Sequence, residues 1–212
     1  MTGHQPTIAE VFSGQRLIPV LHAPDVDRAI GAVQALVDGG LAVIEIVLRT
    51  DAALQAVRAV STAVPEAVIG VGTVRTPAEL RAAVEAGAQF VVSPGTSARL
   101  YDAAAALAVA FLPGASTVTE VLDALDCGFE TVKIFPAAQL GGPSYLDALS
   151  AVTQPARFVP TGGIGALDAA GYLSRASVVA VGGSFVCPSS LVAAHDWPAI
   201  TVLAAAAARH SR

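Results

Sequence analysis

Residues 67–93 read "AVIGVGTVRTPAELRAAVEAGAQFVVS", two nearly apolar runs separated by a helical segment. Thr76 and Glu79 form a capping box with Pro77 at the first helical position, and this combination predicts the start of a helix. Gly87 predicts the end of that helix just before the second run. Because both runs are almost wholly apolar, they are typical of parallel strands that are covered on each face. The stretch therefore predicts a strand–helix–strand unit.

The same unit recurs along the whole chain. Thr117 and Glu120 repeat the capping box, and Gly128 repeats the stop signal. The strands that we expect are residues 16–21, 42–48, 67–72, 89–93, 110–114, 131–135, 157–161 and 177–182. Strands of this kind, alternating with helices, predict an α/β fold and specifically a (β/α)8 TIM barrel that forms a single domain over residues 1–212.

Two further features refine this prediction. An open doubly wound sheet is the rival architecture, but it normally carries a glycine-rich dinucleotide fingerprint after its first strand. Residues 20–25, "VLHAPD", carry no such fingerprint. Thr7 and Glu10 form another capping box, which predicts a short extra helix over residues 7–12 ahead of the first strand.

The composition excludes several classes of function. The chain of 212 residues is 54% hydrophobic and 14% charged, with a net charge of −5 and no cluster of basic residues. It is therefore not disordered, and it lacks the basic surface that a nucleic-acid partner needs. Its longest apolar runs fall short of the ~18–20 residues that span a bilayer, and its start lacks the pattern of a signal peptide. We expect a cytoplasmic protein with no membrane contact.

The two cysteines, Cys127 and Cys187, lie far apart in the sequence. Neither belongs to a Cys-x-x-Cys or Cys/His spacing that would indicate a metal site. We expect both to be buried thiols in a reducing compartment, with no disulfide and no metal.

Lys133 is the only lysine of the chain, and it lies inside the expected strand 131–135, "TVKIF". Alternation along a strand places Thr131, Lys133 and Phe135 on one face, which points into a barrel or to its upper rim. Burial favours the uncharged amine, which attacks ketones, whereas arginine stays protonated and cannot. The alternative is a structural lysine that is paired in the interior.

Glu45 and Arg49 add to this site. In "AVIEIVLRT" (42–50) both point to the same side of the expected strand, with Arg49 nearer to the C-terminal mouth where barrel active sites lie. A lysine, a carboxylate and an arginine that converge from different strands indicate catalysis. Alternatively, Glu45 simply neutralises Lys133 or Arg49 as a buried ion pair.

Glycine pairs end the last two expected strands, in "PTGGIG" (160–165) and "VGGSF" (181–185). Each pair stands immediately before an expected helix, where backbone amides and the helix dipole favour an anion. The loops after strands seven and eight are also the usual phosphate site of barrels. Each pair alone also fits a tight turn. Together they predict a phosphate site at Gly162, Gly163, Gly182, Gly183 and Ser184.

Thr73 and Pro94 end two other expected strands, in "VIGVGT" (68–73) and "FVVSPG" (90–95). Thr73 either donates a hydrogen bond to a bound carboxylate or caps the turn that follows it. The pattern alone fits both interpretations equally well.

Several short motifs together carry a family resemblance. They are "VIEIVLRT" (43–50), "GVGTV" (70–74), "FVVSPGT" (90–96), "LPGASTVTE" (112–120), "VKIFPA" (132–137), "PTGGI" (160–164) and "VGGSFVCP" (181–188). In order and spacing this set resembles the 2-keto-3-deoxy-6-phosphogluconate (KDPG) aldolases, class I aldolases of the Entner–Doudoroff pathway. The resemblance implies a Schiff-base lyase with a (β/α)8 fold, usually a homotrimer, that needs no metal or other cofactor. Its substrates would be a phosphorylated 2-keto-3-deoxy sugar acid and pyruvate, with cleavage of 4-hydroxy-2-oxoglutarate (KHG) as a side activity.

The resemblance also implies a role for each candidate residue. Lys133 would form the carbinolamine and the imine, and Glu45 would move protons directly or through water. Arg49 and Thr73 would hold the pyruvate carboxylate. The remaining contacts would come from Pro94 and Phe135 to the pyruvyl group, from Thr161 to the sugar hydroxyls, and from Gly162, Gly163, Gly182, Gly183 and Ser184 to the phosphate.

Three positions bear on substrate choice. His22 stands where many relatives carry an arginine, so a phosphate or acid contact from the first strand is not implied here. Ala138 stands where relatives often carry a glutamate after "FPA", so no role of that carboxylate carries over. Residues 48–50 read "LRT", whereas galactonate-type aldolases tend to read "LNS", and this favours the gluconate epimer.

Two other functions fit part of the same pattern. One is a phosphate-binding barrel isomerase or epimerase, in which Lys133 acts only as an acid or an electrostatic group. The other is a non-catalytic barrel that senses a phosphorylated metabolite. Glu45 and Arg49 argue against the second, because a pure binding protein has no use for a proton shuttle beside a buried amine.

Overall fold

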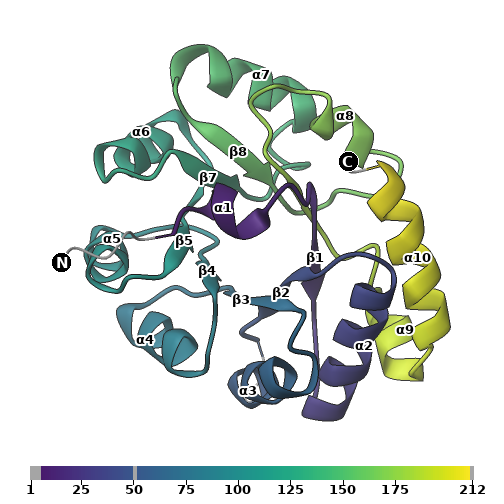
Figure 1. Cartoon of the computed structure of the whole chain (residues 1–212). Coiled ribbons are helices and arrows are strands. Elements are labelled where there is room, and N and C mark those ends of the chain that lie inside the picture. Colours follow the sequence, from purple (N-terminus) through teal and green to yellow (C-terminus); the bar gives the residue numbers. More distant parts are fainter. Residues whose placement is uncertain (1–5, 50–51, 211–212) are drawn as a thin grey trace.

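Parallel strands gather in the middle of the molecule and helices surround them in the computed structural model, which describes residues 6–49 and 52–210 (Figure 1). One sheet has the strand order β5–β4–β3–β2–β1–β9, and a second has the order β6–β7–β8. Every ladder in them is parallel, which confirms the predicted α/β class. The strands are β1 Leu17–Leu21, β2 Val43–Val47, β3 Val68–Gly72, β4 Phe90–Val92, β5 Ala110–Leu112, β6 Gly114–Ala115, β7 Thr131–Ile134, β8 Arg157–Pro160 and β9 Val181–Gly183.

The helices begin and end largely where the cap signals predict. Thr7, Thr76 and Thr117 each form a complete capping box with the glutamate three residues later. Gly87 and Gly128 follow helix ends with φ of +96° and +85°, a conformation that glycine adopts without steric cost. The helices are α1 Ile8–Phe12, α2 Val26–Asp38, α3 Ala53–Ala63, α4 Pro77–Glu85, α5 Ala98–Ala106, α6 Val118–Asp126, α7 Gly142–Val152, α8 Ala169–Leu173, α9 Ser189–Ala194 and α10 Trp197–His210.

The fifth expected strand, residues 110–114, is interrupted at one residue. It divides into β5, which pairs with β4, and β6, which pairs with β7. Pro113 lies between the two and has no N–H to donate to a ladder, although its carbonyl accepts a hydrogen bond from the Lys133 amide at 2.8 Å. The chain therefore changes partner at the proline.

The last expected strand, residues 177–182, is also displaced. Val178 makes only an isolated bridge with Phe158 of β8, and the regular strand begins at Val181. The reason lies in the backbone partners of this segment. The Phe158 amide donates to Ser177 and the Val179 amide donates to Phe158, whereas the Val181 amide donates to Arg16. The regular ladder with β1 thus begins only at Val181, although Gly182 still bridges Thr161 directly after β8.

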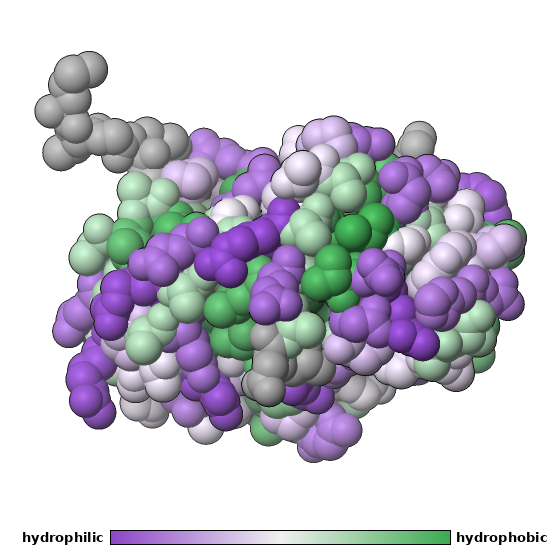
Figure 2. Space-filling view, turned by 90° about the horizontal axis from the view of Figure 1, so that it is seen from below, coloured by the Kyte–Doolittle hydropathy of each residue, from purple (hydrophilic) through white to green (hydrophobic). Residues whose placement is uncertain are grey.

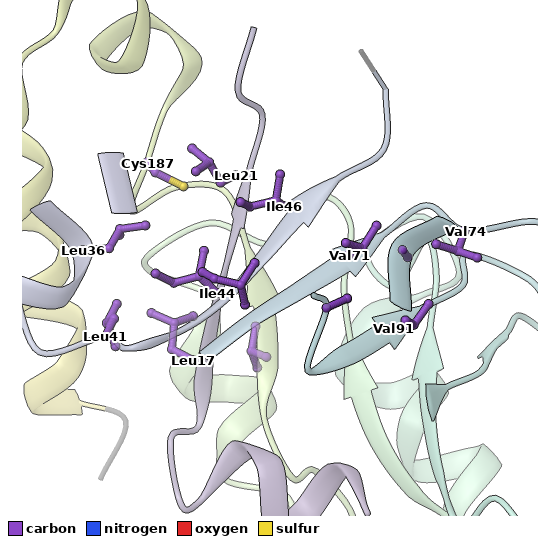
Figure 3. Packing of buried hydrophobic residues seen from close by; sticks show 14 of the residues in the cluster. Leu17, Leu21, Leu36, Leu41, Ile44, Ile46, Val71, Val74, Val91 and Cys187 are labelled. Carbon is purple, nitrogen blue, oxygen red and sulfur yellow. The ribbon is translucent and has the colours of Figure 1, made fainter. Parts of the chain in front are cut away.

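Side chains alternate along the strands between an inner and an outer cluster. Ile44 and Ile46 of β2 point outward and belong to the large apolar cluster that packs between strands and helices. Figure 3 shows Ile44 beside Leu17, with Leu36 of α2 and Leu41 close by. Val43 points the other way into a second cluster. This alternation is what places Glu45 inside the ring of strands.

Helix α1 closes the inner cluster at the amino ends of the strands. It lies across the middle of the ring of strands (Figure 1), and Ile8 and Phe12 belong to the inner cluster. The Phe12 ring meets the Phe90 ring edge-on, with 5.6 Å between the ring centroids. The predicted extra helix is therefore present, and it shields the interior from solvent at this end.

The prediction for the two cysteines is half right. Cys187 is buried, and burial raises the pKa of its thiol to about 12, so it stays protonated near neutral pH. Cys127 is exposed, contrary to expectation, because it is the C-cap residue at the end of α6 and lies outside the packed face of that helix. Both thiols are free.

Within residues 6–49 and 52–210, no helix combines the length and the apolar character that a membrane crossing requires. Two predictions involve residues outside the described ranges. The prediction that the chain has no signal peptide rests partly on residues 1–5, and the "LRT" motif includes Thr50.

The packing of α1 predicts a large cost for removing the Phe12 ring. Phe12→Ala is expected to lower the free energy of unfolding by about 3–5 kcal/mol, because it leaves a cavity against Phe90. Urea denaturation measures this loss. Val152→Ala is the control, since Val152 at the end of α7 is 61% exposed and its truncation should change stability by no more than about 0.5 kcal/mol. Similar unfolding midpoints for the two variants would contradict the packing of α1.

Candidate active site

A cavity of about 390 Å³ opens at the carboxyl ends of the strands. Every residue that the sequence singled out as a site residue lines it, from six strands and the turns that follow them. These residues are Glu45, Arg49, Thr73, Pro94, Lys133, Phe135, Thr161, Gly162, Gly163, Gly182, Gly183 and Ser184. Alternation along the strands predicted that Glu45, Arg49, Lys133 and Phe135 face the interior or its rim, and all four line this cavity.

Lys133 and Glu45 form the centre of the cavity. Lys133 Nζ lies 3.2 Å from Glu45 Oε1, and the two residues are only 5% and 3% exposed. The Lys133 ammonium position also lies 5.7 Å from the centroid of the Phe135 ring. A proton can pass between the amine and the carboxylate at this distance, which would leave a free amine beside a carboxylic acid. Both the catalytic and the structural interpretations of the pair expect this contact.

The approach to this pair carries two further basic groups, His22 and Arg49. His22 is half-buried after β1, and Arg49 is exposed after β2. Burial, and then the positive charge of Arg49, lower the pKa of His22 below its ordinary value of 6.5, although Glu45 acts in the opposite direction. The imidazole is therefore neutral near pH 7, and Arg49 supplies the positive charge at the mouth.

Thr73 has an unusual backbone conformation. Its φ is +64°, in the left-handed region that a β-branched residue rarely adopts. Strain of this kind costs on the order of 1–3 kcal/mol and is often retained at functional sites. The turn places Thr73 in the cavity wall rather than extending β3, and α4 begins later, where it is capped by Thr76.

The glycine pairs lie in the cavity wall, but not at helix starts as expected. Gly162 and Gly163 have φ of +98° and +73°, and α8 begins only at Ala169. Gly182 and Gly183 end β9, and α9 begins only at Ser189. The helix dipole therefore does not contribute as predicted. Gly162 and Gly163 still offer consecutive loop amides with positive φ, an arrangement that turns N–H groups toward an anion, whereas Gly182 and Gly183 are strand residues without positive φ.

Sequence reasoning missed part of the lining. Val20, Val47 and Ile164 supply apolar walls, and His22 lies among them with no role assigned from the sequence. The signal was available, because Val20 and His22 alternate with Leu21 and Val47 lies between Glu45 and Arg49 on the same side of β2.

Size alone does not identify the site. A larger hollow of about 560 Å³ lies near the amino end of β7 and is lined by Thr7, Cys127, Glu130 and Thr131 among others, without any lysine or arginine. Among the residues that the structure describes, no group of three or more His, Cys, Asp or Glu side chains is placed to hold a metal ion. The 390 Å³ cavity is distinguished by its buried amine and carboxylate.

Comparisons with known proteins point to one family. Residues 8–203 match the family model described as KDPG and KHG aldolase. A 2-dehydro-3-deoxy-phosphogluconate aldolase of Pseudoalteromonas atlantica is 40% identical over 92% of this chain and 91% of its own length. A KHG/KDPG aldolase of Escherichia coli is 40% identical over 89% of this chain and 88% of its own length.

A solved structure agrees with these relatives. The KDPG aldolase of Legionella pneumophila, crystallised with pyruvate captured as a covalent carbinolamine intermediate, superposes with a TM-score of 0.93 at 35% identity. The match covers 96% of this chain and 98% of the other.

His22 predicts a dependence of stability on pH. Because its pKa is lowered in the folded protein, the unfolded chain takes up a proton first as the pH falls, so this group's contribution is complete above pH 6.5 and declines below it. His22→Gln removes the titration and is expected to lose less stability on acidification than the native protein. Urea denaturation at a series of pH values measures the difference, and NMR of the imidazole gives the pKa. A His22 pKa at or above the ordinary value would contradict the prediction.

Proposed function

The chain belongs to the KDPG and KHG aldolase family, and we propose that Lys133 is the amine on which it carries out a class I aldolase reaction. The protein is an aldehyde-lyase that reversibly cleaves KDPG to pyruvate and glyceraldehyde 3-phosphate, and KHG is a further substrate. The observation that carries the assignment of residues is the contact between Lys133 Nζ and Glu45 Oε1 at 3.2 Å, inside a cavity large enough for a small phosphorylated acid.

The first half of the reaction attaches the substrate to Lys133. The free amine attacks the C2 carbonyl carbon, and the carbonyl oxygen takes up a proton to give a carbinolamine. Glu45 then delivers a proton to the departing hydroxyl group, which leaves as water. The product is a protonated imine, a cationic centre that can accept the electron pair of a neighbouring bond.

The second half breaks the carbon–carbon bond. A base removes the proton of the C4 hydroxyl, the C3–C4 electron pair moves into an enamine, and glyceraldehyde 3-phosphate is released. Glu45, directly or through water, accepts that proton and returns one to C3 of the enamine. Hydrolysis of the resulting pyruvate imine releases pyruvate and restores the amine of Lys133.

The remaining lining residues position the substrate. Arg49 and Thr73 at the mouth hold the carboxylate, since Arg49 offers a permanent positive charge and Thr73 is fixed by its turn. Pro94 and Phe135 pack on the pyruvyl group. The other contacts are from Thr161 to the sugar hydroxyls and from Gly162, Gly163, Gly182, Gly183 and Ser184 to the phosphate.

The two sheets are best understood as one closed (β/α)8 barrel formed by a single domain over residues 1–212. Two seams support closure. On one side β5 and β6 are separated by Pro113 alone, so they act as one strand that pairs on both sides. On the other side isolated parallel bridges join Phe158 to Val178 and Thr161 to Gly182.

We further propose a cytoplasmic homotrimer. Exposed apolar side chains support subunit contacts, among them Leu167, 97% exposed, and Val202 of α10, 68% exposed. Hydrophobic residues also gather near the middle of one face of the molecule, between hydrophilic ones (Figure 2). A contact in the trimer would cover such residues.

A borohydride trap tests the assignment of Lys133. Pyruvate followed by borohydride should reduce the imine to a stable amine adduct, abolish activity and place the added mass on the peptide that contains Lys133. Lys133→Arg should fold, remain unlabelled at this peptide and show no cleavage of KDPG, because a guanidinium cannot form the imine.

A lysine introduced on the surface provides the matched control. Arg58 is exposed on α3, so Arg58→Lys adds a surface amine, and we expect this amine to stay unlabelled in either background. Cleavage of KDPG by Lys133→Arg, or an adduct on the added lysine and none on Lys133, would exclude the mechanism. Turnover that is insensitive to borohydride would favour the isomerase or epimerase alternative.

Sedimentation equilibrium tests the oligomeric state. We expect a mass of three chains at micromolar concentration, because exposed apolar side chains on a protein of this size favour a defined assembly. A mass of one chain over the whole concentration range would contradict the trimer without affecting the assignment of Lys133.

A further inference from the structure

Strand β3 contributes two glycines to the interior of the fold. Ile69 and Val71 point outward into the cluster beneath the helices, so Gly70 and Gly72, which alternate with them, occupy inward positions. In register, Gly70 is opposite Glu45 of β2 and Gly72 is opposite Val47. The strand therefore presents no inward side chain at either place, while its neighbours carry large ones.

The space at Gly72 is taken by the Glu45 side chain. A Cβ atom built on Gly72 would lie 1.9 Å from Glu45 Oε1, 2.6 Å from Cδ and 2.7 Å from Cγ. All of these are closer than a carbon atom approaches a neighbour that it is not bonded to. The three nearest atoms all belong to Glu45, the side chain that pairs with Lys133.

The backbone does not explain this glycine. Gly72 is the last residue of the regular parallel strand β3 and is not among the glycines with positive φ, so alanine would adopt its conformation without strain. Glycine inside a strand also costs stability relative to other residues and commonly marks a close approach by another group. The structure instead explains the glycine at position 72 by the space that the Glu45 side chain occupies.

We propose that Gly72 is a positioning residue of the aldolase reaction, because the absence of a side chain there allows the Glu45 carboxylate to lie over β3 and within reach of Lys133 Nζ. This inference rests on the proposed roles of Lys133 and Glu45. Gly72 touches the catalytic carboxylate and acts through it.

An added methyl group would displace the carboxylate by a distance that matters for proton transfer. To clear Gly72→Ala, Glu45 Oε1 must move by about 1 Å, and a displacement of that size can lower a rate by about 10²-fold. The alternative positions are limited, since Glu45 is 3% exposed and its neighbours on β2 are buried. The displacement should therefore affect proton transfer more than substrate affinity.

Exchange of the pyruvate methyl protons in D2O provides the most direct measurement. This exchange needs only the imine, the enamine and the proton carrier, and it makes no use of the phosphate site. Gly72→Ala is expected to exchange about 10²-fold more slowly than the native protein, with little change in the KM for pyruvate. Proton NMR of the methyl signal follows the rate.

Gly70→Ala is the matched control, because it places the same methyl group on the same face of the same strand. Its Cβ would meet the Phe90 ring at 2.2 Å and no atom of Glu45 is among its nearest neighbours. It should destabilise the fold while its exchange rate stays closer to the native rate than to that of Gly72→Ala. Equal exchange rates for the two variants would overturn the proposal.

A double-mutant cycle covers the case in which Gly72→Ala folds poorly. Glu45→Ala removes the three atoms that crowd the new methyl group, so the fall in Tm caused by Gly72→Ala should shrink by more than half in that background. For Gly70→Ala the fall should be the same in both backgrounds. If Gly72→Ala lowers Tm by the same amount with Glu45 as with Ala at position 45, the proposal would also be overturned.

The role of Lys133 and the role of Gly72 can be disproved independently of each other. If the borohydride trap does not label Lys133 in the native protein, the proposed mechanism fails, whatever Gly72→Ala does. If the trap succeeds and Gly72→Ala exchanges pyruvate protons as fast as Gly70→Ala, only the role of Gly72 is lost.

Discussion

The interior of the ring of parallel strands must be filled, and this constraint governs the rest of the structure. Every strand is buried on both faces, so alternate side chains meet in the middle. At the amino ends the filling is apolar and is closed by α1 through Phe12 and Phe90. At the carboxyl ends the filling stops short and leaves the cavity. The site is thus the unfilled part of an otherwise packed interior, and its polar groups rest on an apolar floor.

The Lys133–Glu45 pair is costly where it lies. Both residues are almost fully buried, and a buried ion pair gains little over apolar side chains of the same size, since each charge loses its hydration. Apolar residues would fill the same space at least as well for stability alone. Stability therefore does not explain why the only lysine of the chain lies here, whereas the proposed chemistry of its amine does.

Alternation, caps and composition were sufficient to predict much of this. The period of two in "AVIEIVLRT" and "TVKIF" placed Glu45 and Lys133 on the inner side, because buried strands leave no other choice of face. Three features escaped because they depend on partners rather than on local pattern. The division at Pro113 follows from which neighbour each half pairs with, the late start of β9 from a change of partner, and the exposure of Cys127 from its place at a helix end. The missing N–H of Pro113 was nevertheless visible in the sequence.

Three glycines on the inner side of the strands determine how their neighbours pack. Within a closed interior, a large residue on one strand requires a small one on the next, since the volume is shared. Gly70 leaves room for the Phe90 ring, Gly72 for the Glu45 carboxylate, and Gly182 for Thr161, whose Oγ1 lies 2.3 Å from the place a Cβ would take. From the sequence, Gly182 was assigned to a turn or a phosphate site, and Gly70 and Gly72 received no role. In the packed interior each of these glycines leaves space that a neighbouring side chain occupies. The positions of Phe90, Glu45 and Thr161 therefore depend on the lack of a side chain at these three places.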